Sequence, residues 1–154
     1  MPYLFREQGK GNREQFELCF LASVPKHIEK GKSIFMGYIV FKELQVWQRA
    51  MELVEEVYSL VKLLPKEEDF GLKAQLRRAA TSVPSNIAEG NSRHTAKEYV
   101  NFLSIARGSN SEVLTQLLIC NRLGYLNEQQ TDKAINLIEE ISKMLNAMII
   151  KLSK

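Results

Sequence analysis

Residues 75–90 decide the fold, and they read Gln75-Leu76-Arg77-Arg78-Ala79-Ala80-Thr81-Ser82-Val83-Pro84-Ser85-Asn86-Ile87-Ala88-Glu89-Gly90. Their apolar residues recur every three or four positions, which is the period of a helix with one buried face. The small alanines allow a close neighbouring helix, and Arg77 and Arg78 are directed away from the buried face. Pro84 lacks an amide hydrogen and crowds the carbonyl four residues earlier, so we expect a kink or local break there. Gly90 is expected to end the helix in the left-handed conformation.

Polar residues surround Pro84, and we give them structural roles. Thr81 or Ser85 is expected to bond backbone groups that the proline frees. Asn86 and Glu89 are expected either to satisfy backbone donors that Pro84 leaves misaligned or to hold a neighbouring subunit. We therefore interpret Pro84, Asn86, Glu89 and Gly90 as a structural motif and not as a functional loop.

Upstream, the spacing of apolar residues predicts a helix that follows Phe41 and ends at Pro65. The seam that we expect to be buried consists of Leu44, Trp47, Met51, Val54, Tyr58 and Val61. Three further residues widen it, as expected for a helix buried against two neighbours: Leu53, Val57 and Leu60. Trp47 and Tyr58 are accordingly interpreted as core residues and not as platforms on which bases stack.

Downstream, end signals divide the chain into three helices. The first begins near Gly71, with Lys73 directed away from its apolar side, and the next begins at Thr95 with a capping box completed by Glu98. That helix has a polar interruption at 108–111, where Gly108 needs a close neighbour or a strong apolar face to compensate for its low helix propensity. The expected apolar face contains Tyr99, Phe102, Leu103, Ala106, Val113, Leu117 and Cys120.

The last helix follows a short turn in which Gly124 is a carboxyl-terminal cap and Tyr125 folds back on the preceding helix. Asn127 and Gln130 begin this helix, whose stripe is Ala134, Leu137, Ile138, Ile141, Leu145, Met148 and Leu152. Short connections favour antiparallel neighbours. We therefore predict an all-α fold, an antiparallel up-down four-helix bundle over 41–154, preceded by an irregular amino-terminal extension over 1–40.

Composition places the chain among ordinary globular proteins. It has 154 residues, of which 45% are hydrophobic and 25% charged, and a formal net charge of +3. Cys19 and Cys120 match neither a disulfide framework nor a metal site, so we expect both to be reduced and the protein to be cytoplasmic. We expect no membrane segment, no metal and no cofactor.

An ordered series of motifs adds a resemblance. The series is Phe41-Lys42-Glu43-Leu44-Gln45-Val46-Trp47-Gln48-Arg49-Ala50, Phe70-Gly71-Leu72, Gln75-Leu76-Arg77-Arg78-Ala79-Ala80, Val83-Pro84-Ser85-Asn86-Ile87-Ala88-Glu89-Gly90, Lys97-Glu98-Tyr99, Gly108-Ser109, Glu112, Thr115-Gln116-Leu117 and Leu123-Gly124-Tyr125-Leu126. With these motifs the chain resembles the four-helix-bundle proteins encoded in intervening sequences of bacterial 23S ribosomal RNA genes, the S23 ribosomal protein-like family. The resemblance covers about 41–154, and Asn110 departs from it where an apolar residue is expected.

The resemblance implies a fold more strongly than an activity. It implies compact bundles that assemble into ring-shaped homo-oligomers, expected to be pentamers. A related protein is the accessory variability determinant of diversity-generating retroelements, which acts with a reverse transcriptase and with RNA. RNA or a reverse transcriptase-like protein is therefore an expected partner.

Basic residues supply the candidate site. Between Lys73 and Arg122 there are seven basic and three acidic residues. Around the connection between the second and third helices, a phosphate-binding surface is expected to include Arg77, Arg78, Arg93, His94, Lys97 and Arg107, because arginine forks and lysine charges neutralise phosphates without reading sequence. The competing interpretation is a solvated basic face.

The sequence predicts a protein that is not an enzyme, because no nucleophile motif surrounds His27 or His94. The first hypothesis is a homo-oligomeric bundle that binds RNA, or a nucleic-acid-associated protein, through Arg77, Arg78, Arg93, Lys97 and Arg107. The second is a purely structural self-assembling module in which leftover apolar surface on the first and fourth helices makes the ring. The third is a metal-dependent nucleotide hydrolase using Glu52, Glu55 and Glu56, which lacks the second acidic cluster that such sites require.

Overall fold

The computed structural model describes residues 41–154, which form four α-helices and no strand. The helices are α3 (Gln45–Leu60), α4 (Leu72–Asn91), α5 (Ala96–Arg122) and α6 (Glu128–Leu152), with short 3-10 turns at Phe41–Glu43, Val61–Leu63 and Lys66–Glu68. None of the helices in this part of the chain is long and apolar enough to cross a membrane. The predicted irregular extension, 1–40, lies outside the described residues, as do Cys19 and His27.

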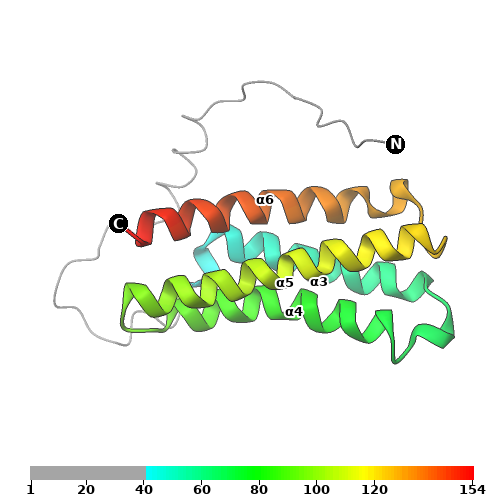
Figure 1. The fold of residues 1–154 in the computed structure, drawn as a ribbon, viewed down its shortest axis with the longest axis horizontal. Coiled ribbons are helices and arrows are strands. Elements are labelled where there is room, and N and C mark those ends of the chain that lie inside the picture. Colours follow the sequence, from blue (N-terminus) through cyan, green and yellow to red (C-terminus); the bar gives the residue numbers. More distant parts are fainter. Residues whose placement is uncertain (1–40) are drawn as a thin grey trace, which may run out of the picture. The chain divides into compact units, whose positions relative to one another are not determined.

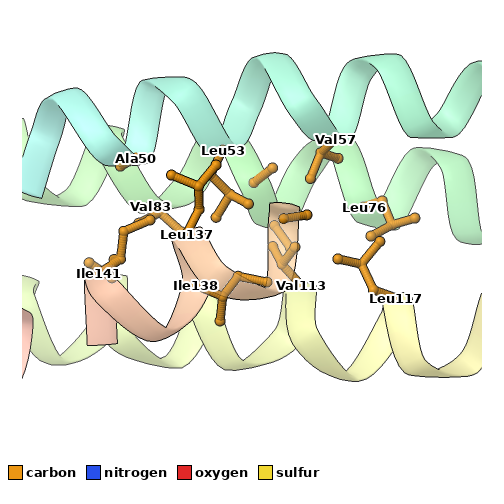
Figure 2. Packing of buried hydrophobic residues seen from close by; sticks show 14 of the residues in the cluster. Ala50, Leu53, Val57, Leu76, Val83, Val113, Leu117, Leu137, Ile138 and Ile141 are labelled. Atoms are coloured by element: carbon orange, nitrogen blue, oxygen red, sulfur yellow. The ribbon is translucent and has the colours of Figure 1, made fainter. Parts of the chain in front are cut away.

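The helices run alternately up and down, and each packs against its neighbours in sequence (Figure 1). Contacts between α3 and α6 close the bundle, so the predicted antiparallel four-helix bundle is confirmed for residues 41–154. Side chains from all four helices meet between them, including Leu53 of α3, Leu76 of α4, Leu117 of α5 and Ile141 of α6 (Figure 2). Each such buried side chain stabilises the fold by about 1.5–3 kcal/mol relative to leaving it exposed.

The buried stripe of α3 is not the predicted one. Its buried residues are Val46, Ala50, Leu53, Val57 and Leu60. Leu53, Val57 and Leu60, which were expected only to widen the buried stripe, therefore form its main part. Of the six residues predicted to form the buried seam, Leu44 and Val61 are buried. Trp47, Met51 and Val54 are half-buried and Tyr58 is 42% exposed, so the prediction that Tyr58 is a core residue is wrong. Both stripes have helical spacing, and small Ala50 made the true one less conspicuous.

Helix α4 continues unbroken through Pro84, so the expected local break is absent from it. Proline has a backbone angle close to that of a helix, and here the flanking hydroxyls bond their own helix. Thr81 donates to the carbonyl of Arg77 at 2.8 Å and Ser85 donates to the carbonyl of Thr81 at 2.8 Å. Neither donates to the carbonyl that Pro84 frees, so that expectation is corrected.

Asn86 and Gly90 also act differently from expectation. Asn86 donates to the carbonyl and hydroxyl oxygens of Ser82, at 2.8 and 2.9 Å, and so satisfies acceptors and not donors. Gly90 is a buried helical residue, and α4 ends one residue later. Among the described residues, only Gly124 has a positive φ, 73°.

Gly90 is required by the close approach of α4 and α5. A Cβ atom at this position would lie 2.7 Å from the Cβ of Phe102 and 2.8 Å from a ring carbon of Tyr99, closer than packed carbon atoms allow. The opposite holds at Gly108, where a Cβ would meet no atom within 4 Å. The expected close neighbour of Gly108 is therefore not found among residues 41–154.

Helix α5 runs unbroken from its cap at Thr95 through the polar residues 108–111, as predicted. Thr95 Oγ1 accepts from the amide of Glu98 at 3.2 Å, which confirms the Thr95 half of the predicted capping box, whereas the Glu98 carboxylate accepts from the Thr95 hydroxyl. Asn110 is fully buried, and its Nδ2 donates to the carbonyl of Ile138 and to Ser142 Oγ, at 2.8 and 2.9 Å. The buried amide thus pairs α5 with α6, which explains why a polar residue is tolerated where an apolar one was expected.

The turn from α5 to α6 confirms its prediction in detail. Beyond Arg122, the amide of Gly124 donates to the carbonyl of Asn121 and the amide of Tyr125 donates to that of Cys120, at 3.1 and 3.0 Å. This is the Schellman arrangement, which needs the left-handed glycine. Asn127 and Gln130 then form a reciprocal capping box at the start of α6.

Lys73 lies on the buried side of α4, which corrects the prediction that it points away. Its side chain is 9% exposed, and its Nζ contacts Asp69 Oδ1 at 2.6 Å. A buried ammonium group is costly unless it is paired. The hydrogen bond from Lys73 lowers the pKa of Asp69, as expected for a carboxylate that is stabilised in its charged form.

We predict opposite effects of alanine at the two helical glycines. Gly90→Ala is expected to lower the free energy of unfolding by about 1–3 kcal/mol, because the new methyl group overpacks the contact with Phe102. Gly108→Ala is the control and is expected to raise it by up to about 1 kcal/mol, because alanine favours a helix and the site is open. Urea unfolding in dilute solution measures both, and equal effects of the two variants would contradict this role for Gly90.

We also predict that Asp69→Asn destabilises the fold in a manner that depends on pH. Because the folded-state pKa of Asp69 is lowered, its contribution is complete above the ordinary aspartate pKa, about 3.9, and is lost as pH falls through the folded-state value. The difference in unfolding free energy between wild type and variant should thus be largest near neutral pH and vanish in acid. Glu139→Gln, at an exposed residue with a 4.0 Å ion pair, is the control and should show little effect. A difference that stays constant with pH would contradict the ion pair.

Candidate nucleic-acid interface

Positive charge is concentrated on α4, α5 and their connection, residues 72–122, which we call the basic hairpin. It contains seven basic and three acidic residues, whereas the remainder of 41–154 contains eight basic and eleven acidic residues. The described part of the chain is therefore nearly neutral as a whole but divided into a basic and an acidic part. Such a division provides the electrostatic footprint that a polyanion recognises.

Arg93 and Lys97 lie at the connection between α4 and α5, at one end of the bundle. The Arg93 guanidinium pairs with Glu89 and lies over the ring of Phe102, 4.7 Å from its centroid. Phe102 and Glu89 thus hold this arginine in place from two helices. Lys97 and His94 are exposed, and Lys97 forms no ion pair with any described residue.

Glu98 is the acidic residue closest in sequence to Lys97, and its side chain is bonded to the cap residue of α5, Thr95. Its Oε2 accepts a hydrogen bond of 2.6 Å from the hydroxyl of Thr95, and this bond lowers the pKa of Glu98. The carboxylate therefore remains charged while it serves the first turn of α5, where the helix dipole favours negative charge. The Glu98 carboxylate thus already supplies negative charge at the amino terminus of α5.

Arg77 and Arg78 lie near the opposite end of α4 and point in different directions. Arg77 lies over the ring of Tyr58 on α3, 5.9 Å from its centroid, and Arg78 Nη2 bonds Glu112 Oε1 on α5 at 2.7 Å. Neighbours in a helix differ in direction by about 100°, which follows from 3.6 residues per turn. The two arginines therefore flank α4 and do not form a pair.

Arg107 faces α6, where its Nη1 donates to Asn146 Oδ1 at 2.8 Å. At about 1.5 Å of rise per residue, Arg78 and Arg93 are roughly 20 Å apart along α4. The five predicted residues are thus distributed over one end and two flanks of the basic hairpin. Arg93 and Lys97 share the connection between α4 and α5, where they are four residues apart in the sequence.

Two of the three acidic residues of α3, Glu52 and Glu56, form ion pairs with basic residues. Glu52 accepts from Arg49 Nη1 at 2.8 Å, and Glu56 contacts Lys133 Nζ of α6 at 2.5 Å, which raises the pKa of that lysine. Residues 41–154 contain no group of three His, Cys, Asp or Glu side chains that could hold a metal ion. Cys120 is a buried free thiol, and burial raises its pKa.

The sequence interpretation missed two residues in the connection between α3 and α4, Glu68 and Phe70. Glu68 Oε2 accepts from the amide of Leu72 at 2.9 Å, and its Oε1 accepts from the hydroxyl of Tyr125 at 3.4 Å. Phe70 beside it is 99% exposed. The only signal for Glu68 was its position four residues before the first amide of α4, and nothing in the sequence showed that Phe70 would be exposed.

Comparisons with known proteins agree with this architecture. A family model described as 23S rRNA-intervening sequence protein matches residues 42–147. A search of curated proteins found no significant match. Among solved structures, the chain is similar to a protein of unknown function from the S23 ribosomal protein family of Bacteroides thetaiotaomicron, with 27% identity and a TM-score of 0.63. The match covers 68% of this chain and 97% of that one.

Proposed function

The chain belongs to the 23S rRNA-intervening sequence protein family, and on that basis we propose that it is a non-enzymatic, self-assembling bundle that binds RNA through its basic hairpin. The observation that carries the proposal is the division of charge, with seven basic against three acidic residues on 72–122 and an acidic excess elsewhere in 41–154. A polyanion is attracted to such a surface even when the molecule as a whole is nearly neutral.

The connection between α4 and α5 is the best supported contact. Lys97 is exposed and without an ion pair among the described residues, and the Arg93 side chain, which lies over Phe102 and pairs with Glu89, is 39% exposed. An arginine fixed in this way loses little conformational freedom when it binds a phosphate. Arg77, Arg78 and Arg107 belong to the same proposal as secondary contacts, since their partners hold them on the flanks of the bundle, away from the connection.

Self-assembly is the second part of the proposal. Several large apolar residues on the described surface are exposed, among them Tyr58, Ile105 and Ile119 at 42, 44 and 39%. Apolar surface beyond isolated residues is typical of interfaces. Assembly would also repeat the contacts of Arg93 and Lys97 once per copy, and linked contacts raise the apparent affinity for a long polyanion. The pentamer and the reverse transcriptase-like partner remain predictions of the resemblance.

The proposal places the protein in the cytoplasm, where RNA is present and a free thiol such as Cys120 stays reduced. The alternative is a purely structural module with no nucleic-acid partner. The two differ in one respect, which is whether RNA binds the basic hairpin in preference to other basic residues of the same protein.

We predict that Arg93→Gln/Lys97→Gln weakens the binding of a short structured RNA and makes it less dependent on salt. Each lost phosphate contact should lower the slope of log K against log salt by about 0.7–0.9, so the double variant should lose roughly 1.5. The measurement is fluorescence anisotropy across a salt series.

The matched control is Arg49→Gln/Lys133→Gln, which removes the same charge from α3 and α6 and also breaks ion pairs. Its affinity and slope should stay close to those of wild type. Equal losses of affinity in both double variants would show that RNA responds to the net charge of the protein alone. If wild type does not bind RNA even at low salt, the purely structural module is the better explanation.

A further inference from the structure

The guanidinium group of Arg93 is held by two neighbours and is still open to solvent. Its Nη2 forms an ion pair with Glu89 Oε1, one turn earlier in the sequence. Its Cζ lies over the ring of Phe102 on α5, 4.7 Å from the ring centroid. The Arg93 side chain is nonetheless 39% exposed. Part of a planar cation that two helices keep in position is therefore available to a ligand.

Net charge alone does not explain why a polyanion would bind at this end of the bundle. Residues 89–98 contain two basic residues, Arg93 and Lys97, and two acidic ones, Glu89 and Glu98, with His94 neutral at pH 7. A phosphate placed here meets as many carboxylates as cations. Binding at the connection therefore needs an interaction other than the attraction between a phosphate and a cation.

The flat shape of the Arg93 guanidinium supplies such an interaction. Nucleobases stack on the planes of aromatic side chains and on those of arginine guanidinium groups. The N–H bonds of a guanidinium lie in its plane, so the ion pair with Glu89 uses an edge and leaves the faces free. Phe102 covers one face. A base on the other face would complete a stack of three planes without breaking the ion pair.

We propose that the connection between α4 and α5 binds single-stranded RNA, with an unpaired base stacked on Arg93 and the adjoining phosphate at Lys97. This inference rests on the proposed function and names the class of RNA. Lys97 is exposed and forms no ion pair with any described residue, so its ammonium group is available to the phosphate. The bases of a duplex are already stacked on one another, whereas a single strand or a loop offers them.

Stacking and charge predict opposite preferences. A duplex carries more negative charge per unit length than a single strand, so a surface that recognises charge alone binds the duplex at least as tightly. A surface that stacks a base binds the single strand more tightly. A strand of the same length without bases keeps every phosphate and lacks only the stacking partner. The three probes therefore separate the two interactions.

Fluorescence anisotropy at fixed salt tests the proposal with wild type and with Arg93→Lys, which keeps the charge and removes the plane. The probes are a short unstructured RNA strand, the same strand with abasic sites in place of its bases, and a duplex of equal length. Wild type should prefer the RNA strand to the abasic strand by about fivefold, the size of one partly exposed contact of this kind, and should also prefer it to the duplex. Arg93→Lys should bind the two strands alike, with an unchanged salt dependence.

Arg49→Lys makes the same exchange on α3 and is the control, which should keep the wild-type preference. Circular dichroism should show that both variants retain their helix content. A wild type that binds none of the probes at low salt would overturn the proposed function, and this inference with it. Binding of the duplex or the abasic strand as tightly as the RNA strand would overturn the inference alone. A preference for bases that persists in Arg93→Lys would do the same, because it would not depend on Arg93.

Discussion

The close antiparallel contact between α4 and α5 is the constraint on which the rest of the described structure depends. It is fixed at three levels, with Gly90 against Phe102 at one end, Ser82 bonded to Ser109 in the middle and Gln116 beside Gln75 at the other end. Residue numbers rise on α5 in nearly equal steps as they fall on α4. A slip by one residue would rotate the apolar faces of both helices away from the core. The register therefore also decides which polar side chains lie outside.

The same register organises the charges. It places Arg78 opposite Glu112, and it puts Arg93 and Lys97 at the connection together with Glu89 and Glu98. Helix α3 has the acidic excess, and it reaches the rest of the bundle through ion pairs of Arg49 with Glu140 and of Glu56 with Lys133. A bundle that is nearly neutral as a whole thus presents two different surfaces. Our proposed function assigns RNA to the connection between α4 and α5.

Helix positions, caps and the antiparallel order could be predicted from the sequence because these features depend on local spacing and on a few residues. Thr95, Gly124 and Asn127 act as their sequence patterns indicate. Packing could not be predicted as well. Helix α3 has two stripes with the same period, and only the neighbours decide which one is buried. From its sequence position Lys73 is expected to be exposed, and only its pairing with Asp69 explains its burial. Gly90 is expected to end a helix, and only the position of Phe102 explains why a glycine is needed there.

The candidate site shows the same limit, since a cluster in sequence became a dispersed set in space: Arg77 and Arg107 face α3 and α6 on different flanks. The even number of helices has one more effect. The chain enters α3 and leaves α6 at the same end of the bundle, and these two helices are packed together (Figure 1). Joining Lys154 to Phe41 by a short linker and opening the turn at Gly124 would give a circular permutant that keeps every helix pair. The order of the helices along the chain is thus separable from the architecture that they build.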